Sequence, residues 1–369
     1  MGSQKPSHAC ELYIGNYMSE LFLDGSKLMH HLPRVNRWKK GAEIAPIHVE
    51  VSPTSGCNQR CNLCYVDYLG HKAGLLDEKI LVDMVDDFAE IGVKSVLLAG
   101  EGEPTVNQGI IPMIQRAKEK NVDMALNSNA VLFNEKMIEG TLPGLTWCRF
   151  TFQASHKELY NRIHQGGKND FEKAIKNVKA AVEFKRKNNL KVTLGIQQIL
   201  INENYRDVLA CAKLAKNLGV DYYVVKRFSK HPKNDYNVPE NIYQESVDLF
   251  DEAQKLSDEN FKVIVRWKNF TKDCNRTYKK CVGTPFITQV LADGGVYPCS
   301  QFFKDPNYIY GNLKDQSFKE IIFGEQAKRV TKRIEEEVDV TKCISYCRHH
   351  STNIFLTKVI EEKLHENFI

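Results

Sequence analysis

The sequence of 369 residues lacks the features of a membrane-spanning or secreted protein. It contains no apolar run near the roughly 20 residues that a membrane-spanning helix needs. Its first ten residues, MGSQKPSHAC, are polar and have no apolar core of a secretory signal. The net charge of +5 is spread without a dense basic block, so composition favours neither nucleic acid nor a membrane surface as a partner. We expect a cytoplasmic protein.

Complete disulfide pairing is also excluded, because the eleven cysteines are odd in number. Clustered cysteines in a chain without a secretion signal are typical of metal ligands in a reducing compartment. Cys57, Cys61 and Cys64 form such a cluster, with C-x3-C-x2-C spacing, after the apolar run Ile47–Val51. Three thiolates can bind three irons of a [4Fe–4S] cube and leave the fourth iron open. A structural zinc loop is the alternative, although zinc usually takes four ligands.

After this loop, apolar β-branched runs alternate with segments of helical spacing, which predicts an α/β fold with a parallel sheet. The expected strands are Ile47–Val51, Lys94–Ala99, Val122–Leu126, Cys148–Phe152, Lys191–Leu200 and Tyr222–Val225. The expected helices include Glu78–Ile91, Ile111–Lys120, Asp170–Asn188 and Tyr205–Leu218. Six such units are too few for a closed (β/α)8 barrel, so we expect a partial (β/α)6 TIM-type barrel. Its reacting groups should gather at the carboxyl ends of the strands.

The second expected strand ends in the turn Gly100-Glu101-Gly102-Glu103-Pro104. The cysteine loop followed by this turn resembles the radical S-adenosylmethionine superfamily, whose architecture is a partial barrel of this kind. The resemblance implies that the open iron binds the methionine end of S-adenosylmethionine and that electron transfer releases a 5′-deoxyadenosyl radical. It also implies that this turn holds the amino group of the cofactor, because glycines permit close approach and a carboxylate suits an ammonium donor. Either Glu101 or Glu103 could supply the carboxylate.

Polar residues at or near the ends of later strands match positions where this family places contacts to cofactor or substrate. They are Asn127, Ser128, Asn129, Gln153, Ser155 and Gln197. A capping or turn role is the alternative. Lys226 and Arg227 end the sixth strand, where two fixed positive charges suit an anionic group of the substrate. A surface salt bridge is the alternative for this pair.

Cysteines return in the last third of the chain, with C-x12-G-x4-C spacing from Cys281 through Gly294 to Cys299. A hairpin turned at Asp293-Gly294-Gly295 is expected between them, and Cys343 and Cys347 follow. This arrangement resembles the auxiliary iron–sulfur domain of radical S-adenosylmethionine enzymes, in its short twitch form rather than the longer SPASM form. The resemblance implies a second [4Fe–4S] cluster on Cys281, Cys299, Cys343 and Cys347. A zinc site on the same cysteines is the alternative.

We therefore predict three regions: an N-terminal extension (1–45), the partial barrel (46–230) and a C-terminal region with the auxiliary domain (231–369). The resemblance implies hydrogen abstraction from a small polar substrate, such as a carbohydrate, aminocyclitol or nucleoside-like molecule, leading to dehydrogenation or epimerisation. Cys274 is a candidate catalytic hydrogen donor for epimerisation, and a spare cluster ligand and a structural cysteine are the alternatives. An electron donor such as flavodoxin or ferredoxin is the expected partner. The alternatives are a ribosomal peptide maturase and a non-enzymatic metal-binding interaction protein.

Overall fold

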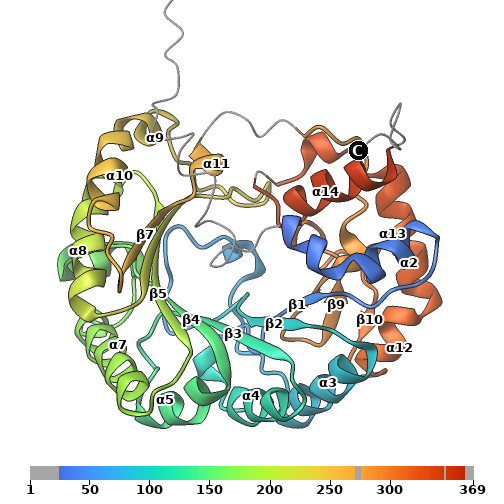
Figure 1. Cartoon of the computed structure of the whole chain (residues 1–369), viewed down its shortest axis with the longest axis horizontal. Helices are drawn as coiled ribbons and strands as arrows, with labels where there is room; N and C mark the ends of the chain where they lie inside the picture. The colour runs from blue at the N-terminus through green and yellow to red at the C-terminus, as the bar shows by residue number, and fades with distance from the viewer. Residues whose placement is uncertain (1–24, 271–275, 345, 362–369) are drawn as a thin grey trace, which may run out of the picture.

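The computed structural model describes residues 25–270, 276–344 and 346–361, which form a curved sheet with helices around it (Figure 1). The strand order is β10-β9-β8-β1-β2-β3-β4-β5-β6-β7. Strands β8 and β1 to β7 pair in parallel, whereas β9 pairs antiparallel with both β8 and β10. The strands are β1 (His48–Val51), β2 (Ser95–Leu98), β3 (Asp123–Ser128), β4 (Leu145–Thr151), β5 (Thr193–Leu200), β6 (Tyr222–Arg227), β7 (Lys262–Val265), β8 (Ile287–Val290), β9 (Gly295–Tyr297) and β10 (Gly311–Asn312).

Helices cover the outer face of the sheet, as Figure 1 shows for the arc from α3 through α4, α5 and α7 to α8. The α-helices are α2 (Leu32–Lys39), α3 (Glu78–Ile91), α4 (Ile110–Glu119), α5 (Glu135–Thr141), α6 (Lys157–His164), α7 (Asp170–Lys187), α8 (Val208–Leu218), α9 (Asn241–Glu245), α10 (Val247–Gln254), α11 (Trp267–Phe270), α12 (Phe318–Phe323), α13 (Glu325–Glu337) and α14 (His350–Ile360). Within the described residues, none of these helices combines the length and apolar character that crossing a bilayer requires.

The predicted α/β partial barrel is confirmed, and a strand is present at each of the six expected positions. The parallel sheet is wider than six strands, because β7 adds beside β6 and β8 adds beside β1. Both added strands come from the part of the chain beyond residue 230, which we assigned to the C-terminal region. That region therefore extends the barrel sheet at both of its edges.

Residues of the strands alternate between the helices and the barrel interior. The outward positions form one apolar core with the helices: Val49, Val51, Val96, Leu98, Met124, Leu126, Cys148, Phe150, Leu194, Ile196, Tyr223 and Val225. The intervening positions face inward, and they include the polar residues Glu50, Asn127, Arg149 and Lys226. Burial of the outward face stabilises the sheet, which leaves the interior free to carry polar chemistry.

The boundaries of α3 show why the chain turns where it does. The side chain of Asp77 caps its first turn by accepting a hydrogen bond from the Lys79 amide at 2.8 Å. The helix ends at Gly92, whose φ of +81° is a left-handed conformation that glycine adopts without a steric penalty. The chain then enters β2 directly, so the loop that follows β2 is delivered to the carboxyl end of the sheet.

The expected hairpin near Gly294 is confirmed as the antiparallel pair β8 and β9. Gly294 has φ of +86°, and a Cβ there would lie 2.6 Å from Asn312 Oδ1. The hairpin joins the barrel through hydrogen bonds from the Ser52 amide to the Val290 carbonyl at 2.8 Å and from the Ile47 amide to the Phe286 carbonyl at 2.9 Å. These bonds place the C-terminal cysteine region beside β1, where the first cysteine loop begins.

Candidate active site

A cavity of about 280 Å³ lies at the carboxyl ends of the barrel strands. Most of the residues predicted for the site line it: Cys57, Cys61, Cys64, Gly100, Gly102, Glu103, Asn127, Ser128, Asn129, Gln153 and Lys226. They come from the loops or ends of five different strands. The structure thus brings the cysteine motif and the glycine–glutamate turn, separated by 36 to 46 positions in sequence, to one hollow.

The cysteine loop is fixed by its own backbone and by its neighbours. The Gly56 carbonyl accepts a hydrogen bond from the Glu103 amide at 3.0 Å, which joins the two motifs. A Cβ at Gly102 would lie 2.0 Å from that carbonyl, so the close approach requires glycine at this position. On the other side, the Asn62 amide donates to the carbonyl of Ile163 in α6 at 3.0 Å. The loop is therefore held between β2 and α6.

The three cysteine side chains fit the role of thiolate ligands. Burial raises the pKa of each thiol, to about 11 for Cys64, and the approach of Cys64 and Cys57 raises the pKa of Cys61 further. Three thiolates could coexist here only if a cation balanced them, and soft thiolates suit iron–sulfur clusters. Among the described residues, no three Cys, His, Asp or Glu side chains converge as ligands of a single ion. A cubane uses a different iron for each thiolate, so its ligands need not converge in that way.

His164 is a residue of this cavity that the sequence did not indicate. Its Nδ1 lies 3.5 Å from Cys61 Sγ and 2.9 Å from Gln59 Oε1, and its Nε2 accepts a hydrogen bond from the Gln153 amide at 3.2 Å. Burial lowers the pKa of His164 to about 3, so the ring is neutral. A neutral ring that accepts at Nε2 carries its proton on Nδ1, so the N–H is shared between Gln59 Oε1 and Cys61 Sγ.

The two candidate carboxylates of the turn point to different places. Glu101 does not line the cavity: it accepts a hydrogen bond from the Ala292 amide at 2.8 Å and lies 4.0 Å from Lys304 Nζ. Glu103 lines the cavity and is 3% exposed. Its oxygens accept from Ser128 Oγ and from the Asn129 amide, both at 2.7 Å. Burial raises the pKa of Glu103 above its usual range.

Gly100 sits where the turn passes closest to β1. Its φ is +128°, and a Cβ there would lie 1.8 Å from Ser52 Oγ. That hydroxyl accepts a hydrogen bond from the Glu101 amide at 2.7 Å. The turn is therefore built so that side chains are excluded at Gly100 and Gly102 and only backbone faces the cavity there.

The remaining predicted residues divide between the cavity and other contacts. Ser155 lies outside it and donates to Asp207 from its amide and its hydroxyl, both at 2.6 Å, which ties the β4 loop to the segment before α8. Gln197 is buried in β5 and is not among the residues that line the cavity. Lys226 lines the cavity, whereas its neighbour Arg227 forms an ion pair with Glu240 and lies 4.0 Å over the ring of Tyr243.

The four C-terminal cysteines also lie near one another. Burial raises the pKa of Cys299 well above its usual range, and the thiols of Cys347, Cys281 and Cys343 raise it further. Asn353 Nδ2 donates to Cys281 Sγ at 3.3 Å. Arg276 donates from Nη2 to the carbonyls of Cys343 and Ile344, at 3.1 and 2.7 Å. Four thiols in one buried place can hold a second cluster. Cys274 lies outside the described residues.

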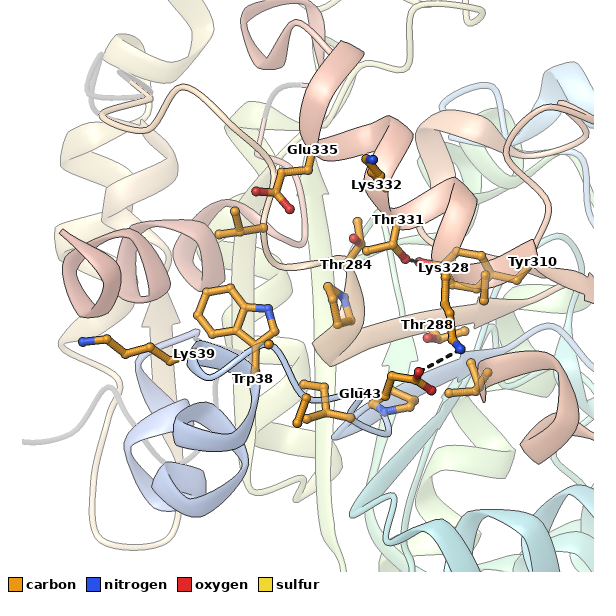
Figure 2. A pocket seen from close by; sticks show the side chains of 18 of the residues that line it. Trp38, Lys39, Glu43, Thr284, Thr288, Tyr310, Lys328, Thr331, Lys332 and Glu335 are labelled. Carbon is orange, nitrogen blue, oxygen red and sulfur yellow. Dashed lines mark hydrogen bonds and ion pairs between the residues drawn. The ribbon is translucent and has the colours of Figure 1, made fainter. Parts of the chain in front are cut away.

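A second cavity, of about 470 Å³, lies between the segment after α2 and helix α13 (Figure 2). Trp38 borders it and meets Phe286 edge to face, with ring centroids 5.5 Å apart. Lys328 and Glu43 form an ion pair of 2.8 Å across its rim. Of the described residues that line this cavity, none is a cysteine, whereas Cys57, Cys61 and Cys64 line the first cavity.

Comparison with known proteins agrees with this geometry. The sequence model of the radical SAM superfamily matches residues 51–215, and that of the SPASM iron–sulfur cluster-binding domain matches residues 281–349. The chain is 23% identical over 73% of its length to a tungsten-containing aldehyde ferredoxin oxidoreductase cofactor-modifying protein of Pyrococcus furiosus, covering 78% of that protein. It is also 23% identical over 81% of its length to the Fe-coproporphyrin III synthase of Methanosarcina barkeri, covering 77% of that protein.

Solved structures share the fold. Streptococcus suis SuiB bound to its precursor peptide SuiA matches with a TM-score of 0.64 at 14% identity, covering 92% of this chain and 78% of SuiB. The structure of anSMEcpe with AdoMet and a peptide matches with a TM-score of 0.59 at 18% identity, covering 85% of this chain and 99% of that one. The cofactors are thus S-adenosylmethionine and two [4Fe–4S] clusters. The chain belongs to the radical S-adenosylmethionine superfamily and carries a C-terminal iron–sulfur domain of the SPASM/twitch type.

Proposed function

We propose that this enzyme removes a hydrogen atom from a small polar molecule. The observation that carries the proposal is the shared cavity, where three cysteines, a glycine–glutamate turn and a lysine surround one space at the barrel mouth. When bound, the first cluster and S-adenosylmethionine supply a one-electron cleavage that yields a 5′-deoxyadenosyl radical. The protein must orient the reactants and exclude water.

Each motif has a separate role in this proposal. Cys57, Cys61 and Cys64 hold the first cluster, and the turn at Gly100–Glu103 holds the amino group of S-adenosylmethionine. Glu103 is the proposed carboxylate for that ammonium, because it faces the cavity while Glu101 faces the hairpin. Ser128 and the Asn129 amide orient Glu103 by hydrogen bonding to it. Asn127, Asn129 and Gln153 are the proposed polar contacts to cofactor or substrate.

Dehydrogenation and epimerisation differ in the step after hydrogen removal. Epimerisation needs a residue that returns a hydrogen atom to the opposite face of the carbon, and Cys274 is the proposed donor. Dehydrogenation needs no such residue. The variant Cys274→Ala separates them: a dehydrogenase keeps turning over, whereas an epimerase still forms 5′-deoxyadenosine but no longer inverts its substrate. Solvent deuterium in the product would identify the epimerase.

Peptide maturation is the second candidate. SuiB, whose structure holds a precursor peptide, aligns with 92% of this chain. The relatives from Pyrococcus furiosus and Methanosarcina barkeri favour the small-molecule reaction instead, because their names describe cofactor modification and synthesis of a porphyrin. Turnover supported by a peptide and by no small molecule would establish the second candidate.

The first test is cofactor cleavage. Protein purified and reconstituted without oxygen, then reduced with dithionite, should convert S-adenosylmethionine to 5′-deoxyadenosine and methionine. In the cell, the proposed electron donor is a flavodoxin or ferredoxin, and the proposed compartment is the cytoplasm. Stoichiometric zinc without iron, and no 5′-deoxyadenosine, would leave the non-enzymatic metal-binding protein as the better description.

A further inference from the structure

Basic side chains from four separate elements gather inside the barrel. Arg149 comes from β4, Lys226 from β6 and Arg266 from the residue after β7, while Arg348 follows Cys347 in the C-terminal cysteine loop. The charges of Arg266, Arg149 and Arg348 all act on Lys226. We call these four residues the basic cluster. It connects the two cysteine regions, since Lys226 lines the cavity of Cys57 and Arg348 adjoins Cys347.

The register of the sheet sets the positions of three members. Arg149 of β4 lies opposite Gly195 of β5, which in turn lies opposite Tyr222 of β6. Lys226 lies on the same face of β6 as Tyr222, four residues closer to the carboxyl end. The Arg266 amide donates to the Val225 carbonyl at 3.2 Å, so Arg266 continues β7 beside Lys226. These three side chains therefore lie on the inner face of the barrel, on β4, on β6 and just after β7.

The basic side chains of the cluster face a single carboxylate, Glu50. Even without Arg266, three basic side chains face Glu50 of β1. Glu50 is already engaged, because it forms an ion pair with Arg348, lies 3.8 Å from His48 Nε2 and accepts from Gln289 Nε2 at 2.6 Å. Burial, with the other members of the cluster, lowers the pKa of Lys226 well below its usual range. Like charges that are held close together repel each other more strongly where water is partly excluded.

The cluster is also accessible from the cavity. Arg149 is only 5% exposed, but Lys226 and Arg266 are half-buried and the Arg348 side chain is 30% exposed. Asn127 connects the two places, since it lines the cavity and accepts a hydrogen bond from Arg149 Nε at 3.1 Å. A ligand in the cavity can therefore contact Lys226 directly, and it lies next to Asn127, which holds Arg149.

We propose that the basic cluster binds a phosphate group of the substrate. This inference rests on the proposed function, because it names the class of molecule that the radical chemistry acts on. When a bound anion keeps Lys226 protonated, Lys226, Arg149 and Arg348 exceed the single carboxylate of Glu50 by two positive charges. That excess suits a dianion better than a single carboxylate, and guanidinium groups match phosphate oxygens in pairs. The phosphate would anchor the substrate between the two clusters and leave its reacting carbon toward the cysteine cavity.

The test measures binding of inorganic pyrophosphate to the reconstituted holoenzyme in the presence of saturating S-adenosylmethionine. Calorimetry at low salt should detect binding that weakens as ionic strength rises. Lys226→Gln and Arg266→Gln should each weaken it about ten- to hundredfold, the loss of one charge-assisted hydrogen bond. Lys226→Arg should restore part of the affinity. Lys213→Gln, which removes an exposed lysine of α8, should bind as the wild type does.

The outcomes separate this inference from the proposed function. If the holoenzyme cleaves S-adenosylmethionine but pyrophosphate does not bind, the phosphate inference is overturned and the radical enzyme stands. Malonate binding as tightly as pyrophosphate would overturn it in favour of a dicarboxylate. Equal binding by Lys226→Gln and the wild type would show that the anion binds elsewhere. Iron content and thermal melts of each variant test whether it is folded, so that a loss of affinity can be told from a loss of structure.

Discussion

The Nδ1 of His164 lies 3.5 Å from the Sγ of Cys61, the middle cysteine of the first motif. The ring stacks on Tyr160, with centroids 3.9 Å apart, and this contact fixes its plane. Because Nε2 accepts from the Gln153 amide, the Nδ1 proton is shared between Gln59 and Cys61. A hydrogen bond to a ligating sulfur is one of the means by which a protein sets the reduction potential of an iron–sulfur cluster.

The first prediction is that His164→Phe lowers the reduction potential of the first cluster by about 20–60 mV. An N–H near the sulfur stabilises the more negative, reduced state, and its loss removes roughly 0.5–1.5 kcal/mol from that state. Phenylalanine keeps the stacking on Tyr160. A redox titration followed by electron paramagnetic resonance measures the shift, with the exposed His30→Phe as the control. An unchanged potential at unchanged iron content would show that the contact with Cys61 is inert.

The second prediction concerns the two sets of cysteines, which serve as controls for each other. The wild type should bind roughly eight irons as two cubanes. Replacing Cys57, Cys61 and Cys64 by alanine should remove about half of the iron and all cleavage of S-adenosylmethionine. Replacing the C-terminal four (Cys281, Cys299, Cys343 and Cys347) should also remove about half, yet leave the spectrum of the first cluster and its cofactor cleavage. Iron content unaffected by the second change would contradict the auxiliary cluster.

The third prediction separates the two glutamates of the turn. Glu103→Ala should weaken S-adenosylmethionine binding ten- to hundredfold, because a charge-assisted hydrogen bond contributes about 1.5–3 kcal/mol. Glu101→Ala should leave that affinity close to wild type and instead lower the melting temperature, since Glu101 receives the Ala292 amide of the hairpin. Equilibrium binding and thermal melts distinguish the two effects. The reverse pattern would mean that the turn presents Glu101, not Glu103, to the cofactor.

Features that depend on local spacing could be predicted from the sequence. The cysteine loop and the glycine–glutamate turn are short motifs, and their place after strands follows from apolar runs that the helices bury. His164 and Arg348 could not be found in this way. Each reaches its partner through the packing of distant elements: His164 is 103 positions from Cys61, and Arg348 lies 298 positions from Glu50. Such pairs depend on tertiary packing, which no local pattern encodes.

The same reason explains why Glu101 and Arg227 stand away from the cavity, although each adjoins residues that line it. Successive residues of an extended chain point to opposite sides. Lys226 points inward, and Arg227 therefore points to Glu240 and Tyr243. To decide which of two neighbouring residues faces the cavity, one must know what packs against the other side of the chain. For Glu101 that partner is the hairpin, whose residues come almost two hundred positions later in the sequence.

The last prediction concerns Glu50 and acid. Arg348, His48 and Gln289 hold the pKa of this buried carboxyl well below its ordinary value of 4.5 against the opposing effect of burial. A carboxyl with a lowered folded-state pKa stabilises the fold above its unfolded pKa, and this contribution is lost as pH falls through the folded value. Glu50→Gln should therefore destabilise the protein at pH 7, by about 3–5 kcal/mol, because it leaves Arg348 without its charge partner.

Urea melts at pH 7 and at successively lower pH check this expectation. The difference in stability between the wild type and Glu50→Gln should be constant at and above pH 6 and should shrink below about pH 4.5. In that range the Glu50 carboxyl takes up a proton in the unfolded chain but stays ionised in the folded protein. Glu139→Gln, an exposed carboxylate of α5, should match the wild type throughout. A difference that stays constant into acid would show that Glu50 stabilises the barrel by shape and hydrogen bonding, and that its charge is not what opposes the basic cluster.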